Sequence, residues 1–110
     1  MIENTLEEIE ARLAQTAAMT PESRVALLRL LATLKSEITA LSETDDDRAR
    51  SIAGFTQVST HEATRGEKNP ELLKLAIEGL ASSVGGFEHS HPRLVQIVNS
   101  ICNTLSNLGI

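Results

Sequence analysis

Three prolines divide this 110-residue chain into helical segments. Each of them follows a polar residue, in the pairs Thr20-Pro21, Asn69-Pro70 and His91-Pro92. Proline is favoured at the first helical position, where its missing N–H group would have no intrahelical partner in any case. Threonine and asparagine are also good N-cap residues. The prolines therefore predict where three helices begin.

The spacing of the apolar residues predicts five helices, because leucine, isoleucine and valine recur every three or four positions. The predicted ranges are 4–18, 21–42, 46–64, 70–88 and 92–108. No segment alternates apolar and polar residues in the way that a half-buried strand would. We therefore expect an all-α fold: one domain over residues 1–110, a small antiparallel bundle of four to five helices arranged as hairpins and completed by self-association.

The composition agrees with a helical bundle and argues against nucleic acid as a partner. The chain has two Phe and neither Trp nor Tyr, and an aliphatic core suits helices better than a β-sandwich. The formal net charge is −5 and the ten basic residues are scattered. A phosphate-binding surface would need clustered Lys and Arg, and base stacking would need aromatic rings.

The expected location is the cytoplasm. The N-terminus MIENTLEEIE is acidic and amphipathic, which is the opposite of a signal peptide. No apolar run approaches the roughly 20 residues that span a bilayer, so a membrane is not an expected partner. The single cysteine, Cys102, allows no intrachain disulfide and suits a reducing compartment.

Two stretches leave alternatives open. Residues 44–66 either form a separate helix that starts at the aspartates 45–47, or extend the second helix in one heptad phase, as in a coiled coil. Gly54 weakens both interpretations. Gly85 and Gly86 fall inside the fourth predicted helix, so either that helix ends there or a neighbouring backbone packs closely against it.

The stretch from Phe87 to Pro92 holds the residues with the most chemical potential. Glu88, His89 and His91 are candidate metal ligands, because His-x-His pairs bind zinc or copper when a strand or loop holds them. The favoured interpretation is a corner between two helices. In that corner Phe87 fills the gap, Glu88 reaches His91 or the free amides of the next helix, and His91 is the N-cap. No metal or other cofactor is predicted.

The sequence predicts no catalytic site. Cys102 lies about three helical turns, or about 15 Å, from His91, which is too far for a Cys–His pair. His61 is expected on the solvent side of helix 46–64. The chain has no glycine-rich phosphate loop, no G-x-S-x-G and no Cys-x-x-Cys. We therefore expect a protein that is not an enzyme.

Val25 and Leu28 lie away from the main apolar stripe of helix 21–42, and a chain of this size has little to cover them. They form the predicted oligomer face, with a homodimer as the favoured assembly and an unidentified protein as a further partner. At the other end, Gly109 is expected at C′, with Ile110 in contact with Leu105 as in a Schellman motif.

The last 25 residues follow a recognisable pattern of F-E-x-x-H-P, a helix and a final Asn-x-Gly-Ile. The pattern falls on Phe87, Glu88, His91, Pro92, Asn107, Gly109 and Ile110. In this it resembles a bacterial family of short proteins known as a domain of unknown function, number 4404. The resemblance implies a small bacterial cytoplasmic helical protein and brings no activity with it.

Together these observations predict a non-catalytic helical module for protein interaction that self-associates. The alternative is a regulator that binds a metal or a small ligand at the corner from Glu88 to His91. Neither interpretation identifies a partner or a ligand.

Overall fold

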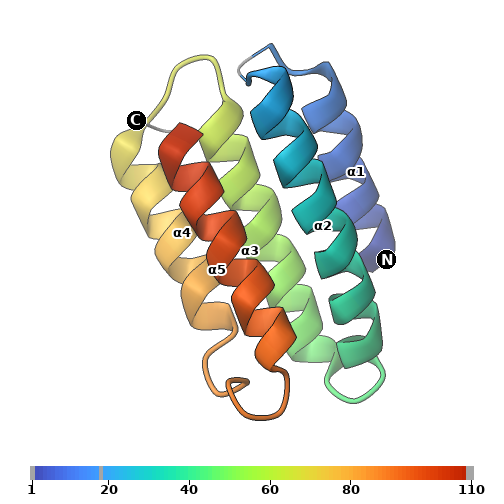
Figure 1. Ribbon diagram of the computed structural model, residues 1–110. Helices are drawn as coiled ribbons and strands as arrows, with labels where there is room; N and C mark the ends of the chain where they lie inside the picture. Colours follow the sequence, from blue (N-terminus) through green and yellow to red (C-terminus); the bar gives the residue numbers. More distant parts are fainter. Residues whose placement is uncertain (1, 18, 109–110) are drawn as a thin grey trace.

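The computed structural model describes residues 2–17 and 19–108, and these residues form five α-helices. They are α1 (Ile2–Gln15), α2 (Pro21–Ser42), α3 (Asp46–Thr64), α4 (Pro70–Ser83) and α5 (Pro92–Leu108). Figure 1 shows the helices packed side by side, each running in the opposite direction to the one before it. The described residues contain no strand. The prediction of an all-α bundle is therefore confirmed.

Side-chain caps explain where α2, α3 and α4 begin. Each cap oxygen accepts the N–H group three residues ahead, in the pairs Thr20–Ser23 (3.2 Å), Asp45–Arg48 (3.1 Å) and Asn69–Leu72 (3.2 Å). Such caps satisfy amides that have no partner within the helix. The Asp45 cap follows a turn after Ser42, so the middle of the chain is a separate helix and not an extension of α2.

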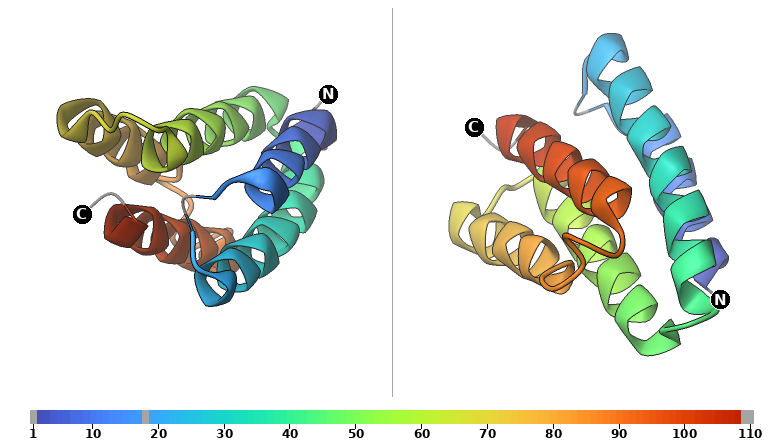
Figure 2. Two further views of the ribbon diagram at one scale, coloured as in Figure 1. Left: turned by 90° about the horizontal axis from the view of Figure 1, so that it is seen from above. Right: turned by 60° about the horizontal axis from the view of Figure 1, so that its bottom comes forward.

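The helix α3 occupies the centre of the bundle, and among the described helices it is the one that packs against all four others. Seen from above, α1 and α2 lie on one side of the bundle and α4 and α5 on the other (Figure 2). The inward face of α3 carries mainly small side chains: Ala49, Ala53, Thr56, Ser59, Thr60 and Ala63. Small side chains let neighbouring helices come close to the α3 backbone.

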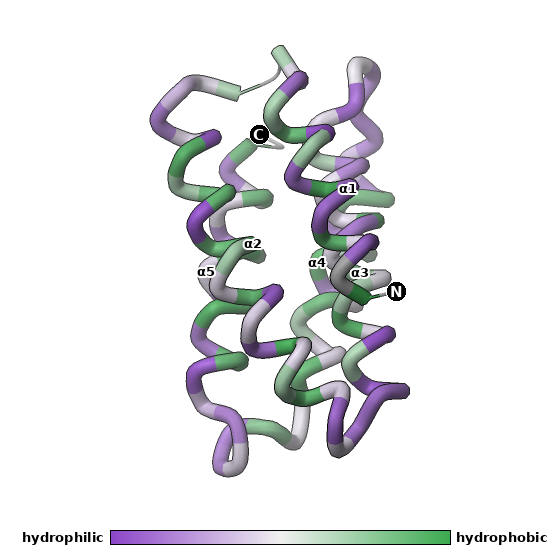
Figure 3. The backbone as a smooth tube through the Cα atoms, turned by 90° about the vertical axis from the view of Figure 1, so that its right-hand side faces the viewer, coloured by the Kyte–Doolittle hydropathy of each residue, from purple (hydrophilic) through white to green (hydrophobic). Residues whose placement is uncertain are grey.

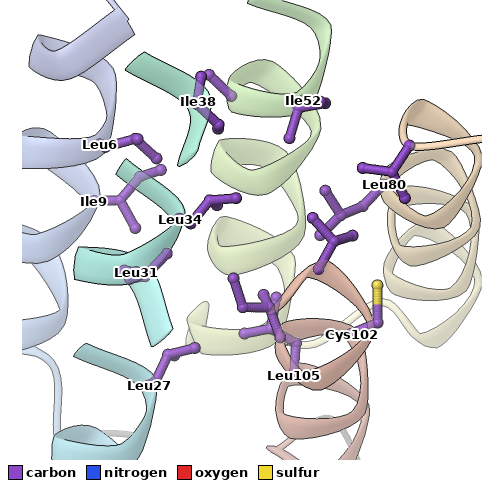
Figure 4. Packing of buried hydrophobic residues seen from close by; sticks show 14 of the residues in the cluster. Leu6, Ile9, Leu27, Leu31, Leu34, Ile38, Ile52, Leu80, Cys102 and Leu105 are labelled. Atoms are coloured by element: carbon purple, nitrogen blue, oxygen red, sulfur yellow. The ribbon is translucent and has the colours of Figure 1, made fainter. Parts of the chain in front are cut away.

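Larger aliphatic side chains from the other helices fill the interior. Figure 4 shows Leu6 of α1, Leu34 of α2, Leu80 of α4 and Leu105 of α5 among them, and all four are fully buried. The hydropathy along the chain agrees, because apolar and polar stretches alternate along the helices while the connections between α2, α3 and α4 are mainly polar (Figure 3). The core is therefore aliphatic, as the composition suggested.

Two helix boundaries differ from the prediction. The first helix covers Ile2–Gln15 and not 4–18, of which Ala18 lies outside the described residues. The fourth ends at Ser83, so its predicted extension to residue 88 is wrong. Gly86 has φ of 93°, a conformation that residues with a Cβ atom rarely adopt and that turns the chain out of the helix. Of the two explanations for the glycine pair, the helix end is the one found.

Candidate functional site

The turn that joins α4 to α5 is held by Arg48 of α3, which is not among the site residues predicted from the sequence. Its guanidinium donates to the carbonyl oxygens of Ser83 (3.1 Å) and Gly85 (2.6 Å) and lies 4.5 Å from the centre of the Phe87 ring. Carbonyl groups at the end of a helix lack intrahelical donors, and the ring attracts the cation. No local pattern reveals this role, because Arg48 meets these partners only in the folded chain.

The corner residues are arranged partly as predicted. Phe87 is buried in the corner. The rings of Phe87 and His91 pack edge to face, with a distance of 5.2 Å between their centroids. Glu88, however, reaches neither His91 nor the amides of α5. Its carboxylate accepts the N–H of Gly86 at 3.0 Å, because the turn leaves that nearer amide without a helical partner. The Nδ1 atom of His91 lies 3.0 Å from the hydroxyl of Ser90.

The candidate metal ligands do not converge on one point. Glu88 binds the backbone, His89 is exposed, and His91 lies against Phe87. Among the residues that the structure describes, no three His, Cys, Asp or Glu side chains are placed to hold a metal ion. The corner is thus a packing contact in which Pro92 starts α5.

Cys102 is a buried thiol between α5 and α4. Its Sγ atom lies 3.9 Å from the carbonyl oxygen of Ile77. Burial raises the pKa of Cys102 and a backbone hydrogen bond lowers it in part, with burial the larger effect. A thiol of this kind stays protonated and is a poor nucleophile. His61 lies half-exposed on α3, with Nε2 3.8 Å from Oε2 of Glu62.

The two residues of the predicted oligomer face differ in exposure. Val25 is 49% exposed, whereas Leu28 is partly buried against the core. Because Leu28 is partly covered, the exposed apolar surface of this predicted face is limited to the area around Val25. The predicted cap at the chain end concerns Gly109 and Ile110, which lie outside the described residues, while Leu105 is fully buried.

A larger apolar surface lies on the outer side of α3 and α4, where Phe55, Val58, Leu72 and Leu75 form what we call the α3–α4 strip. All four are exposed, Leu75 the most at 63%. The two helices run antiparallel, and Phe55 lies so close to Gly79 that a Cβ atom there would come within 2.6 Å of its Cδ1. Because residues spaced by three share one helix face, Val58 and Leu75 extend the same surface by one turn.

The opposite flank of α3, which faces α1, carries two adjoining pockets that are open to solvent. The smaller has a volume of about 100 Å³ and the larger about 440 Å³. Glu8 of α1 and Gln57 of α3 line both. Arg12 and His61 belong to the smaller pocket, while the open space beside Gly54 belongs to the larger one.

Three threonines along α3 differ in the hydrogen bonds of their hydroxyl groups. The hydroxyls of Thr56 and Thr64 each donate to the carbonyl four residues back, at 2.7 Å. Thr60 lies between them and lines the smaller pocket, yet its buried hydroxyl has no hydrogen-bond partner in the described chain. An unpaired buried hydroxyl costs about 1–3 kcal/mol. The signal in the sequence, a threonine every fourth residue, did not distinguish the middle one.

Among residues 2–17 and 19–108, no helix combines the length and the apolar character needed to cross a membrane. No curated protein and no solved structure matches the chain. Residues 27–110, from the second turn of α2 onward, match the family described as Domain of unknown function (DUF4404). This range covers more than half of the sequence and includes the corner and all of α3, α4 and α5. The chain belongs to the DUF4404 family.

Proposed function

We propose that this protein is a non-catalytic helical interaction module and that its partner is a second copy of itself, bound through the α3–α4 strip. The strip carries the proposal, because it holds four of the five large apolar side chains exposed in the described residues. The fifth, Val25, stands alone on α2. Contiguous exposed apolar surface with a polar rim on a small protein commonly marks an interaction site.

The charges on α4 favour a copy of the same chain. Exposed Lys74 lies between the exposed acids Glu71 and Glu78, next to Leu75 in the strip. A two-fold axis near Leu75 sets the two α4 helices antiparallel, so that Lys74 of each copy lies across from Glu78 of the other. A parallel pairing would place like charges together. Self-complementarity of this kind is what an isologous interface requires.

The size of the strip predicts a modest affinity. Stable interfaces bury about 800 Å² on each partner, and the strip supplies only the central part of that area. The polar residues around the strip supply the remaining buried area but add little to the binding free energy. We therefore expect a dimer with a dissociation constant of about 10–100 μM.

Sedimentation equilibrium at about 100 μM tests the proposal, since that concentration populates a dimer of this strength. Wild-type protein is expected to dimerise, and Leu75→Glu is expected to be monomeric and fully folded because the side chain is exposed. Val25→Glu is the matched control, an exposed apolar residue changed to the same acid on α2. It is expected to leave the dimer intact.

A charge exchange tests the orientation of the two copies. Lys74→Glu should weaken the dimer, because the new carboxylate of each copy would lie across from Glu78 of the other copy. Combining Lys74→Glu with Glu78→Lys should restore the dimer. A monomeric wild-type protein refutes the proposal. So does a dimer that Val25→Glu dissociates and Leu75→Glu does not, because that outcome assigns the interface to α2.

A further inference from the structure

Two adjoining open pockets lie between α1 and α3, and we call them together the α1–α3 gap. Its two pockets adjoin at Glu8 and Gln57 and together are as large as the smaller ligand sites of proteins. The site is distinct from the α3–α4 strip, because the two lie on opposite flanks of α3.

The smaller pocket offers donors for an anion. Arg12 lines it from α1, and its guanidinium makes no ion pair or hydrogen bond within the described residues. A guanidinium group presents a planar pair of donors that matches a carboxylate. His61 lines the same pocket from α3, and Thr60 adds the buried hydroxyl that lacks a partner. One of the three buried polar side-chain atoms that lack a partner in the described residues therefore lies in this pocket, beside an arginine that makes no ion pair there.

A negative charge lies beside these donors. Glu8 precedes Arg12 by one helical turn, in the orientation that favours an ion pair, yet the two are unpaired within the described residues. Glu8 lies where the two pockets meet, as does the carboxamide of Gln57, which can donate and accept. A ligand with a carboxylate at Arg12 and an adjacent ammonium group at Glu8 would satisfy both charges.

The larger pocket is suited to an aliphatic group. Its apolar part is formed by Ile2, Ala53 and Gly54, and nothing lies within 4 Å of the position that a Cβ atom would take at Gly54. The rest of the lining is polar: Asn4, Thr5, Glu8, Arg50 and Gln57. The open space is continuous with the charged pocket through Glu8 and Gln57. An aliphatic side chain next to the two charged groups of a ligand can extend into it.

We propose that the α1–α3 gap binds a small zwitterion of the amino-acid type. Its carboxylate is held by Arg12 and His61, its ammonium by Glu8, and its aliphatic side chain lies over Gly54. Because the site draws on both α1 and α3, the bound ligand bridges these two helices and adds to the stability of the bundle.

Titration calorimetry on the full chain tests the proposal with three probes. Leucine carries both charges, leucinamide lacks the carboxylate, and N-acetylleucine lacks the ammonium group. Leucine is expected to bind with a dissociation constant below about 1 mM, and each analogue at least about tenfold more weakly. Leucine should also raise the melting temperature.

Three variants locate the binding. Arg12→Gln should weaken leucine binding about tenfold, whereas Arg29→Gln, which removes an exposed arginine on α2, should leave it unchanged. Gly54→Leu fills the larger pocket and should exclude leucine while keeping every charged group. Melting curves of the ligand-free variants verify that each is folded.

Three results overturn the proposal: no binding of leucine at about 10 mM, equal binding of leucine and leucinamide, or leucine binding that survives Arg12→Gln. The first would mean that the gap holds water only. None of these results bears on the dimer, which is measured without ligand, so the two proposals fail separately.

Discussion

The two flanks of α3 differ in how completely the neighbouring helix covers them. Toward α4, Gly79 lets the Phe55 ring lie against the neighbouring helix, and Arg48 closes the end of the seam. Toward α1, a gap remains that is lined by Glu8 and Arg12. Leu6 and Ile9 of α1 are buried in the core, so the space beside α3 is open only where α1 presents charged side chains. Long charged side chains keep their ends in water and leave the pocket unfilled.

The largest expected effect concerns the closed seam. Arg48→Ala removes two charge-assisted hydrogen bonds and the contact with Phe87, which we expect to lower the free energy of unfolding by about 2–3 kcal/mol. Arg50→Ala is the control on the open flank. Its ion pair with Asp46 is half-exposed, so it should cost less than about 1 kcal/mol. Urea denaturation measures both, and equal losses would mean that Arg48 does not hold the seam.

A matched pair of glycine substitutions compares the flanks directly. Gly54→Ala meets open space and gains helix propensity, so it should stabilise the fold by about 0.5–1 kcal/mol. Gly79→Ala gains the same propensity but overlaps Phe55, which must swing into solvent. We expect it to be less stable than Gly54→Ala by about 1–2 kcal/mol in chemical denaturation. Equal stability of the two variants would mean that α3 is not packed more tightly beside Gly79 than beside Gly54.

The smallest expected effect concerns the threonines of α3. Thr60→Val removes a buried hydroxyl that has no partner among the described residues, so it should be neutral or stabilising by up to about 1 kcal/mol. Thr56→Val removes a hydroxyl that donates to the Ile52 carbonyl and should cost about 0.5–1.5 kcal/mol. Thermal unfolding of the two variants gives the sign. A loss at Thr60 as large as that at Thr56 would show that the Thr60 hydroxyl is satisfied in solution.

The sequence predicted the helix starts well and one helix end poorly. Thr20 and Asn69 act within a few residues of themselves, so their caps could be identified from local pattern alone. The apolar spacing of Val84 and Phe87 led to a fourth helix that was too long. Both side chains are buried, but by the turn at Gly86 and not by a helix, and periodicity does not distinguish the two.

The candidate sites were harder to predict, for a related reason. The corner around Phe87 was identified, whereas the partner of Glu88 was not, because the Gly86 amide becomes available only once the turn has formed. On α2, spacing placed Val25 and Leu28 together, but Leu28 is partly covered by the folded core. An apolar residue off the main stripe is exposed only if no neighbouring helix reaches it.

By itself, the sequence determined five amphipathic helices and the points where three of them begin, because caps, prolines and apolar spacing act within one or two turns. The tertiary structure alone decided that α3 is central, that Arg48 holds the end of α4, that the α3–α4 strip stays uncovered and that a gap opens toward α1. Each of these depends on how closely helices distant in sequence approach one another. That approach is set by the volumes and charges of both facing surfaces, which no single segment contains.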